Sequence, residues 1–396
     1  MIQTNKKSLC CGCESCGLVC PKSCISFEKD ELGHKYAKID SLSCIDCKKC
    51  ESVCPIQKDF SSTQIGCNAY VVYSKDSGIR KRASSGGVFE TIATWVVDNG
   101  GYVFASKFDE KLKLKCFEVK NRDEVKTLTK SKYLQSECTH VFPSIKQYVQ
   151  DGKKVLFVST PCQVAALKAY LGKNGNSDNL YLLDFFCHGV PSQEFFDKCI
   201  RYIEQKKGIV VKNYEFRSKI KNGKTPHYLT LTYEKNGSQK KKTLLYLSDP
   251  FYLAFQKYVT LRESCYNCPY GSGNHAADIT MGDFHHVNRY LAGINRFDGV
   301  SLMLQNTPKG LEMWNSVKDY FECHNVSIDT LYKDKEIYAG GTQKPSSRDS
   351  FLEDVKNLDM DSLVKKWFNE KYEWKKKIYY HLPDFIRNNL KRIIGL

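Results

Sequence analysis

A chain of 396 residues with 41% hydrophobic and 26% charged residues has the composition of an ordinary soluble globular protein of two or three domains. Its 60 basic and 44 acidic residues give a net charge of +16, which favours anionic partners; without a zinc-finger, RRM or helix-turn-helix signature, we expect no nucleic acid. The start has no apolar h-region, and no stretch approaches the ~20 apolar residues of a membrane span, so the sequence predicts a cytoplasmic protein. With 19 cysteines in a reducing compartment, metal binding is the expected role of many of them.

Residues 1–60 contain two copies of one cysteine pattern, C-x₂-C-x₂-C-x₃-C followed by proline. This spacing is typical of bacterial ferredoxins with two [4Fe–4S] clusters, in which the fourth cysteine of each run binds the other run's cluster. Zinc sites do not need three cysteines so spaced, and a disulfide framework would need an oxidising compartment. We therefore expect a ferredoxin-like domain with two clusters, one on Cys10, Cys13, Cys16 and Cys54 and the other on Cys20, Cys44, Cys47 and Cys50.

Strand and helix signals alternate over the next part of the chain, residues 66–190. The predicted buried strands are 69–73, 102–105, 154–158 and 180–186, and helices are expected at 88–97 and 164–171. Such alternation is typical of α/β units with some parallel strand pairing. Residues 191–350 continue this body with a helix at 193–207, strands at 214–217 and 228–233, and an Asn236-Gly237 hairpin turn. The predicted fold class is therefore a small ferredoxin-like module followed by a mixed α/β body.

A second group of cysteines lies outside the module. Cys162 and Cys187 each follow a predicted buried strand, so both could emerge at the edge of a parallel sheet where α/β proteins bind ligands. Cys265 and Cys268 form a CxxC motif, and the four thiols together could hold a third [4Fe–4S] cluster. The alternatives are a zinc site, a redox-active dithiol at the CxxC motif, or inert buried thiols.

Other residue types suggest a ligand site. The run 84–87 (SSGG) opens a predicted helix, where free N–H groups and glycine could cradle a phosphate, although serine is also an ordinary helix cap. Lys130 and Lys132, beside Tyr133, could contact phosphate or simply be solvated. His188 and His285 are candidate acids or bases. Asp278 and Asp283 could orient a ligand or cap turns.

Taken together and in order, these stretches resemble the coenzyme F420 hydrogenase/dehydrogenase beta-subunit family over roughly residues 1–290. The matching segments are 85–89 (SGGVF), 130–136 (KSKYLQS), 160–163 (TPCQ), 187–192 (CHGVPS), 216–219 (FRSK), 265–268 (CYNC) and 278–284 (DITMGDF). The resemblance implies an iron–sulfur flavoprotein with FAD beside the four-cysteine cluster. It also implies FAD or substrate contacts from the cofactor-binding residues Ser85, Gly86, Gly87, Lys130, Lys132 and Tyr133.

The chain departs from the family pattern at two positions near the expected substrate face. His275 stands where relatives tend to carry arginine, and His285 where they tend to carry tryptophan after Gly-Asp-Phe. Relatives with a fused ferredoxin module also occur beside surface-polysaccharide synthesis enzymes. The substrate is therefore expected to be an F420-like molecule or a surface-polysaccharide-related intermediate.

The C-terminal residues 351–396 read as a basic helical tail. Within it, residues 371–396 have seven lysines and arginines against two acids, with apolar residues at helical spacing after Pro383. Such a helix could contact an anionic membrane surface or simply dock on the body.

Two functions from different classes follow from these features. The first is an iron–sulfur flavoprotein oxidoreductase that takes electrons from a ferredoxin or other one-electron donor and passes them through the clusters and FAD to a small-molecule acceptor. The second is an electron-transfer subunit with no substrate site of its own, docked on a larger redox enzyme.

Overall fold

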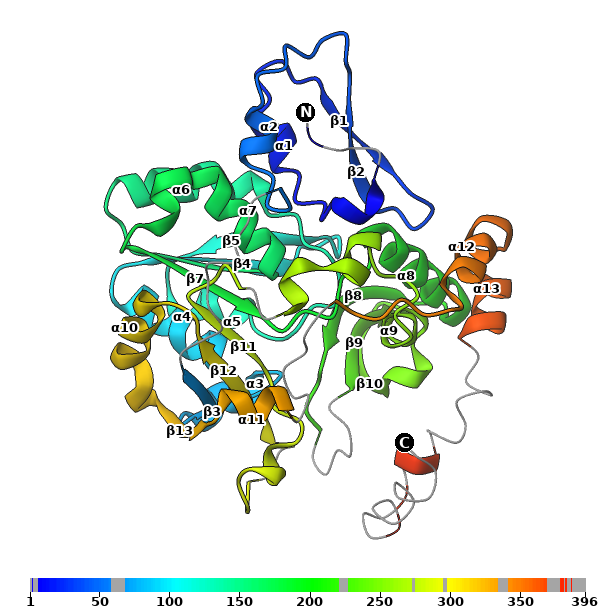
Figure 1. The fold of residues 1–396 in the computed structure, drawn as a ribbon. Coiled ribbons are helices and arrows are strands. Elements are labelled where there is room, and N and C mark those ends of the chain that lie inside the picture. The colour runs from blue at the N-terminus through cyan, green and yellow to red at the C-terminus, as the bar shows by residue number, and fades with distance from the viewer. Residues whose placement is uncertain are drawn as a thin grey trace.

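Three sheets organise the chain in the computed structural model (Figure 1). The structure describes residues 2, 6–57, 68–220, 227–272, 275–294, 298–333, 341–368, 378–380, 382 and 386. The N-terminal module stands on top of a larger body, and the C-terminal helices lie at one side of that body. Within the described residues, no helix combines the length and apolar character needed to cross a membrane.

The N-terminal module is small and built around its cysteines. Its strands β1 (Ile25–Lys29) and β2 (Lys35–Ile39) pair antiparallel. Two short helices, α1 (Ser15–Leu18) and α2 (Lys49–Ser52), each include the third cysteine of a run. The residue before each helix is left-handed, Glu14 with φ 60° and Lys48 with φ 59°, so the two runs repeat one backbone geometry.

The centre of the body is an eight-stranded sheet in the order β13-β3-β12-β11-β7-β6-β4-β5. The four central strands β4, β6, β7 and β11 run parallel, whereas the strands on either side pair antiparallel. The bounds are β3 (Asn68–Ser74), β4 (Tyr102–Phe108), β5 (Leu114–Val119), β6 (Val155–Val158), β7 (Leu180–Phe185), β11 (Ile279–Asp283), β12 (Ser301–Gln305) and β13 (Phe321–Val326).

Helices cover both faces of this sheet, which explains why β6, with the sequence VLFV, is apolar and buried throughout. In β6, Leu156 and Val158 pack with α4 (Val88–Asp98), α5 (Arg122–Thr127) and α10 (Pro308–Val317), while Val155 and Phe157 pack with α6 (Phe142–Gln150) and α7 (Pro161–Leu171) on the other face. The mixed α/β body is confirmed. Strands β11 to β13 join β3 to β7 in one sheet, so that sheet includes strands from both sides of the predicted division at residue 190.

A second core lies beside the sheet, around the antiparallel strands β8 (Val210–Phe216), β9 (Tyr228–Lys235) and β10 (Ser238–Leu245). It is filled by α8 (Gln193–Lys207), α9 (Pro250–Gln256), α12 (Arg348–Asn357) and α13 (Met360–Trp367). Asn236 and Gly237 both have positive φ, as the predicted hairpin turn requires. Residues 351–368 therefore pack into the body, while most of the predicted membrane-contacting segment, 371–396, lies outside the described residues.

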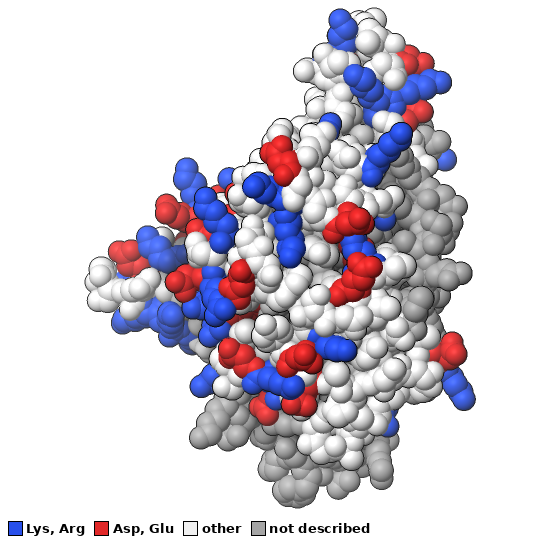
Figure 2. Space-filling model, turned by 90° about the vertical axis from the view of Figure 1, so that its left-hand side faces the viewer, with Lys and Arg blue, Asp and Glu red and all other residues white. Residues whose placement is uncertain are grey.

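Charged side chains of both signs are interspersed on the face shown in Figure 2. On this face, the excess of positive charge does not gather into one basic stripe.

Candidate redox site

The first group of thiols, here called the inner set, consists of Cys10, Cys13, Cys16 and Cys54. Burial raises the pKa of Cys16, and the neighbouring thiols of Cys13, Cys10 and Cys54 raise it further. Cys54 in turn interacts with Cys13 and Cys10. The structure thus brings the fourth cysteine of the second run to the first three of the first run.

The second group, the outer set, consists of Cys20, Cys44, Cys47 and Cys50. All four line one cavity of the module, together with Cys24 and the exposed Lys22, Lys48 and Lys49. Within the described residues, no three histidine, cysteine or acidic side chains are grouped closely enough for a single metal ion. A four-iron cluster gives each thiolate its own iron, so its ligands lie further apart than those of one ion. Both sets therefore offer the donor chemistry and number that a [4Fe–4S] cluster needs.

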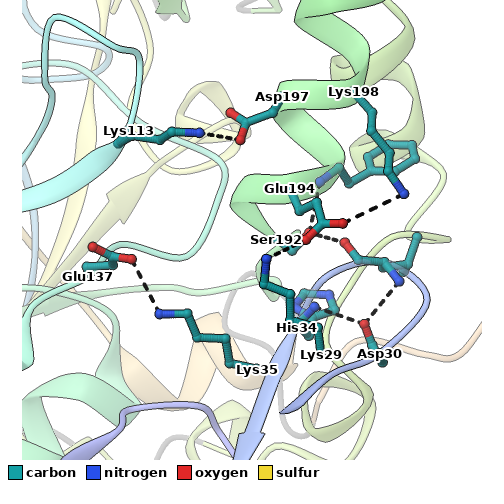
Figure 3. Close-up of polar contacts among 12 residues, drawn as sticks. Lys29, Asp30, His34, Lys35, Lys113, Glu137, Ser192, Glu194, Asp197 and Lys198 are labelled. Atoms are coloured by element: carbon teal, nitrogen blue, oxygen red, sulfur yellow. Dashed lines mark hydrogen bonds and ion pairs between the residues drawn. The ribbon is translucent and has the colours of Figure 1, made fainter. Parts of the chain in front are cut away.

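The module is fixed to the body by polar contacts, many of them shown in Figure 3. Ser192 Oγ, at the start of α8, donates to Leu32 O, and Lys29 Nζ lies 2.8 Å from Glu194 Oε2. On β2, Lys35 Nζ lies 3.4 Å from Glu137 Oε1. The ring nitrogen Nε2 of His34, a buried side chain in the turn before β2, lies 3.1 Å from Thr260 O. These contacts hold one side of the module against the body.

The four remaining predicted ligands also come together, in the body. Cys162 lies in the first turn of α7 after β6, and Cys187 follows the adjacent parallel strand β7. Cys265 lies in a 3-10 helix, Glu263–Asn267, and Cys268 follows it. Burial, followed by the thiols of Cys265, Cys162 and Cys268, raises the pKa of Cys187 well above its usual value. This four-cysteine set therefore lies at the carboxyl end of the parallel strands, where the sequence places it.

One further cysteine connects these groups and was not predicted to have a role. Cys11 is 7% exposed and lies between the inner set and the four-cysteine set. Hydrogen bonds with the thiols of Cys13 and Cys162, followed by burial, raise its pKa well above the usual value. Its position beside Cys10 in the sequence gave no hint of this contact with Cys162.

Gly189 gives a test of the packing around the four-cysteine set. Its φ is +104°, and an added Cβ would lie 2.9 Å from Cys265 Cβ and 2.7 Å from Leu261 Cδ1. Gly208 also has positive φ, +59°, but nothing lies within 4 Å of an added Cβ. We expect Gly189→Ala to destabilise the chain by about 2–4 kcal/mol and Gly208→Ala by about 1 kcal/mol, because only the first adds a collision to backbone strain. Denaturant unfolding of both variants measures the difference, and equal losses would contradict it.

The predicted FAD-contacting segments lie side by side. Ser84 Oγ accepts from Ser131 N at 2.8 Å, which joins the glycine loop to the Lys130–Tyr133 segment. Gly86 is needed for packing, since an added Cβ would lie 2.5 Å from Val72 O. Gly87, with φ 91°, precedes α4, which has no side-chain cap at its start. The N-terminal N–H groups of α4 therefore have no capping side chain, as a phosphate-binding helix start requires.

The two predicted lysines differ in their surroundings. Lys130 forms an ion pair with Glu215, and Lys132 Nζ donates to Leu128 O at 2.5 Å and Thr129 O at 2.7 Å. Burial, followed by the charges of Lys130 and Lys107, lowers the pKa of Lys132 to about 7. Both ammonium groups are thus engaged within the protein.

Tyr133 connects this segment to an ion pair that was not predicted from the sequence. Arg217, 5% exposed and with φ 57°, donates from Nη1 to Tyr133 Oη at 2.9 Å and forms an ion pair with Asp283 at the end of β11. Burial opposes ionisation of Asp283, but the charges of Arg217 and His285 lower its pKa to about 2. Lys219 Nζ donates to Ser85 O at 2.9 Å. The pair and its neighbours thus form one polar site.

Both predicted catalytic histidines interact electrostatically with Asp283. His285 Nε2 lies 3.7 Å from Asp283 Oδ2. Burial lowers the pKa of His188, and the charge of Asp283 opposes that shift. His275 lies elsewhere, buried with its Nδ1 3.0 Å from Asp184 Oδ2. Asp278 has a structural role instead. Its Oδ2 accepts a hydrogen bond from Leu182 N at 2.9 Å, and its Oδ1 accepts one from Thr307 Oγ1 at 2.7 Å.

Comparison with known families gives this arrangement a context. Residues 9–58 match the 4Fe-4S dicluster domain, and residues 152–329 match the family that describes the C terminus of the coenzyme F420 hydrogenase/dehydrogenase beta subunit. The chain carries a domain of the F420 hydrogenase/dehydrogenase beta-subunit family, C-terminal to a dicluster domain. The resemblance and the ferredoxin-type module predicted from the sequence are confirmed. The first match supports iron–sulfur clusters in the module, and the second relates the body to that beta subunit.

Two known proteins show partial similarity to the chain. NADH-quinone oxidoreductase subunit I 2 of Geobacter metallireducens is 40% identical over 58 residues, which are 13% of this chain and 44% of the relative, so the match spans less than half of that protein. A chain of the xenon-derivatized F420-reducing [NiFe] hydrogenase complex from Methanosarcina barkeri aligns with a TM-score of 0.44 and 17% identity, covering 76% of this chain and 91% of the other. A similarity as distant as the second says nothing of residue roles.

Proposed function

We propose that the chain is a flavoprotein oxidoreductase that takes electrons from a ferredoxin-type one-electron donor and transfers them to a small-molecule acceptor. The proposal adds two cofactors to the dicluster domain: a third [4Fe–4S] cluster on the four-cysteine set and FAD beside Arg217 and Asp283. FAD, when bound, supplies the conversion between one-electron and hydride transfer. A cytoplasmic location, with contact of residues 371–396 with the membrane surface as an option, belongs to the same proposal.

The position of Cys11 is the observation that carries the proposal. Its thiol contacts Cys13 of the inner set and Cys162 of the four-cysteine set, so the two sets are neighbours. Cys187 of the latter set precedes His188, whose pKa responds to the charge of Asp283. In the proposed path, electrons pass from the outer set to the inner set, then to the four-cysteine set and finally to the polar site of the arginine–aspartate pair.

The side chains around that pair suit an anionic ligand. Arg217 Nε is buried without a partner among the described residues, so it has a donor to offer. Burial, followed by the charge of Arg80, lowers the pKa of Lys219 to about 8, which leaves it mostly cationic at neutral pH. His188 and His285 are placed to hold or release a proton near Asp283. The acceptor could be F420-like or a surface-polysaccharide-related intermediate.

Cofactor analysis of a Cys162→Ala variant tests the proposal. We expect about twelve irons per parent chain and about eight in the variant, because one four-iron cluster loses a ligand. Cys199→Ala is the matched control, since Cys199 is also buried but lies in the second core. Iron and sulfide are assayed anaerobically, and extracted flavin is identified. An unchanged iron count in Cys162→Ala would remove the third cluster.

A second function is favoured by one relative, which is itself named as a subunit of a larger enzyme. On that reading the chain is an electron-transfer subunit with no substrate site. Flavin bound to the isolated chain, with turnover of an acceptor, supports the first function. A flavin-free chain that holds its clusters supports the second.

A further inference from the structure

Arg262 is a cation buried between the module and the body. It is 2% exposed and lies in the body, just before the CxxC motif. Its Nη1 donates to Lys35 O at 2.9 Å and approaches Cys10 O at 3.5 Å, and its Nε donates to Gln135 Oε1 at 2.9 Å. The guanidinium also lies 4.8 Å from the ring centre of Tyr36.

The same guanidinium lies directly against the loop that carries the first thiols of the inner set. An added Cβ at Gly12 would lie only 2.3 Å from Arg262 Nη2, and Gly12 has a φ of +67°. Gln135 Nε2 donates to both Cys11 O and Gly12 O at 2.9 Å, which fixes this loop in place. The cation and the loop of the inner set are therefore held rigidly together.

Among the residues that the structure describes, no acidic side chain neutralises the charge of Arg262. Within the described residues its hydrogen-bond partners are two backbone carbonyls and one side-chain amide, and none is a carboxylate. A buried charge is costly unless an opposite charge compensates it. The nearby groups that become anionic are the cluster-binding thiolates.

The outer set has a different environment. Its nearby lysines, Lys22, Lys48 and Lys49, are exposed, and Cys47 is exposed as well. Water and salt screen charges at such positions far more than charges in the interior. The two sets thus share a ligand pattern but differ in how strongly a fixed positive charge acts on them.

We propose that Arg262 makes the two clusters of the dicluster domain unequal, by raising the reduction potential of the cluster on the inner set above that of the cluster on the outer set. A one-electron carrier that reduces a cluster adds one negative charge and breaks no bond, so a fixed neighbouring cation favours the reduced form. An electron that enters at the outer set, beside the exposed Cys47, then moves toward the higher potential of the inner cluster, next to the body. This direction rests on the function proposed above, whereas the difference in potential requires only the two clusters of the dicluster domain.

The test is a redox titration of the full-length holoprotein followed by electron paramagnetic resonance. Arg262→Gln removes the charge and keeps a hydrogen-bonding side chain. At a fixed ambient potential we expect the ratio of reduced to oxidised inner cluster to fall about tenfold, which is about 59 mV for one electron. The outer cluster is expected to keep its potential and serves as the reference within the same molecule. Arg262→Lys keeps the charge and is expected to restore most of the shift.

Two further variants separate the effect of charge from that of docking. Ser192→Ala removes the hydrogen bond to Leu32 O and weakens docking without changing any charge, so it should leave both potentials in place. Gln135→Glu puts a carboxylate beside the guanidinium of Arg262 and should lower the reduction potential of the inner cluster. This variant keeps the test available if Arg262→Gln loses iron. An unchanged inner potential, an equal shift of both clusters, or the same shift in Ser192→Ala would each overturn the proposal. None of these outcomes depends on bound flavin or a third cluster.

Discussion

Replacing Asp283 by asparagine is expected to destabilise the folded chain by about 3–5 kcal/mol, because it leaves Arg217 as a buried cation without its anion. Arg217 is 5% exposed, its Nε has no partner among the described residues, and its Nη1 has only the neutral Tyr133 Oη besides Asp283. Denaturant unfolding of the two proteins measures the loss. Asp123→Asn, which breaks the exposed pair with Lys126, is the control and is expected to change stability little.

The pH dependence of this variant gives a second readout. The pKa of Asp283 is about 2 in the folded chain, against about 3.9 when unfolded, so its stabilisation is complete above about pH 5 and is lost as the pH falls toward 2. The difference in unfolding free energy between the parent and Asp283→Asn should therefore shrink by about 2–3 kcal/mol as the pH falls from 5 toward 2. Unfolding rates after a rapid pH jump measure this before acid destroys the clusters. A deficit that stays constant over this range would mean that the carboxylate is not held ionised by Arg217.

Replacing Cys54 by serine is expected to remove the inner cluster and spare the outer one, although Cys54 belongs to the second cysteine run. In the structure Cys54 interacts with Cys13 and Cys10, whereas Cys20 lines the cavity of Cys44, Cys47 and Cys50. Each of the two variants, Cys54→Ser and Cys20→Ser, should lose about four irons. The cluster that remains distinguishes them.

In Cys54→Ser the remaining cluster is the outer one, beside the exposed Cys47, and we expect ferricyanide to bleach it quickly. In Cys20→Ser the remaining cluster lies against the body and should bleach more slowly. Stopped-flow absorbance measures both rates. If each run held its own cluster, the two variants would show the reverse order of rates.

Much of the site could be predicted from the cysteines because short-range spacing limits their chemistry. The two runs pointed to a dicluster module, and the family match confirms it. The strands before Cys162 and Cys187 predicted that both thiols leave one sheet edge, and β6 and β7 are indeed parallel neighbours. In both cases a local pattern, read along a few residues, was enough.

The contacts between distant segments could not be predicted in this way. Arg262 was given no role and Gln135 was noticed only as part of a matching segment, yet they join the inner set to the body across more than 100 residues of sequence. Arg217 was noticed only as part of a motif, and its partner Asp283 could equally have capped a turn. His275, expected near the substrate face, instead pairs with Asp184 in the interior.

The cysteine spacing by itself determined the class of chemistry, because a thiol pattern that suits a four-iron cluster suits few other ligands. Alternating apolar runs determined the mixed α/β body, because buried strands and amphipathic helices have distinct periods. Only the tertiary structure decided which thiols are neighbours and that Cys11 lies between two sets. It also decided that Arg262, which has no acidic partner in the described part of the chain, lies beside the inner set. Those relations depend on how the module docks on the sheet, and docking is set by long-range contacts that leave no periodic trace in the sequence.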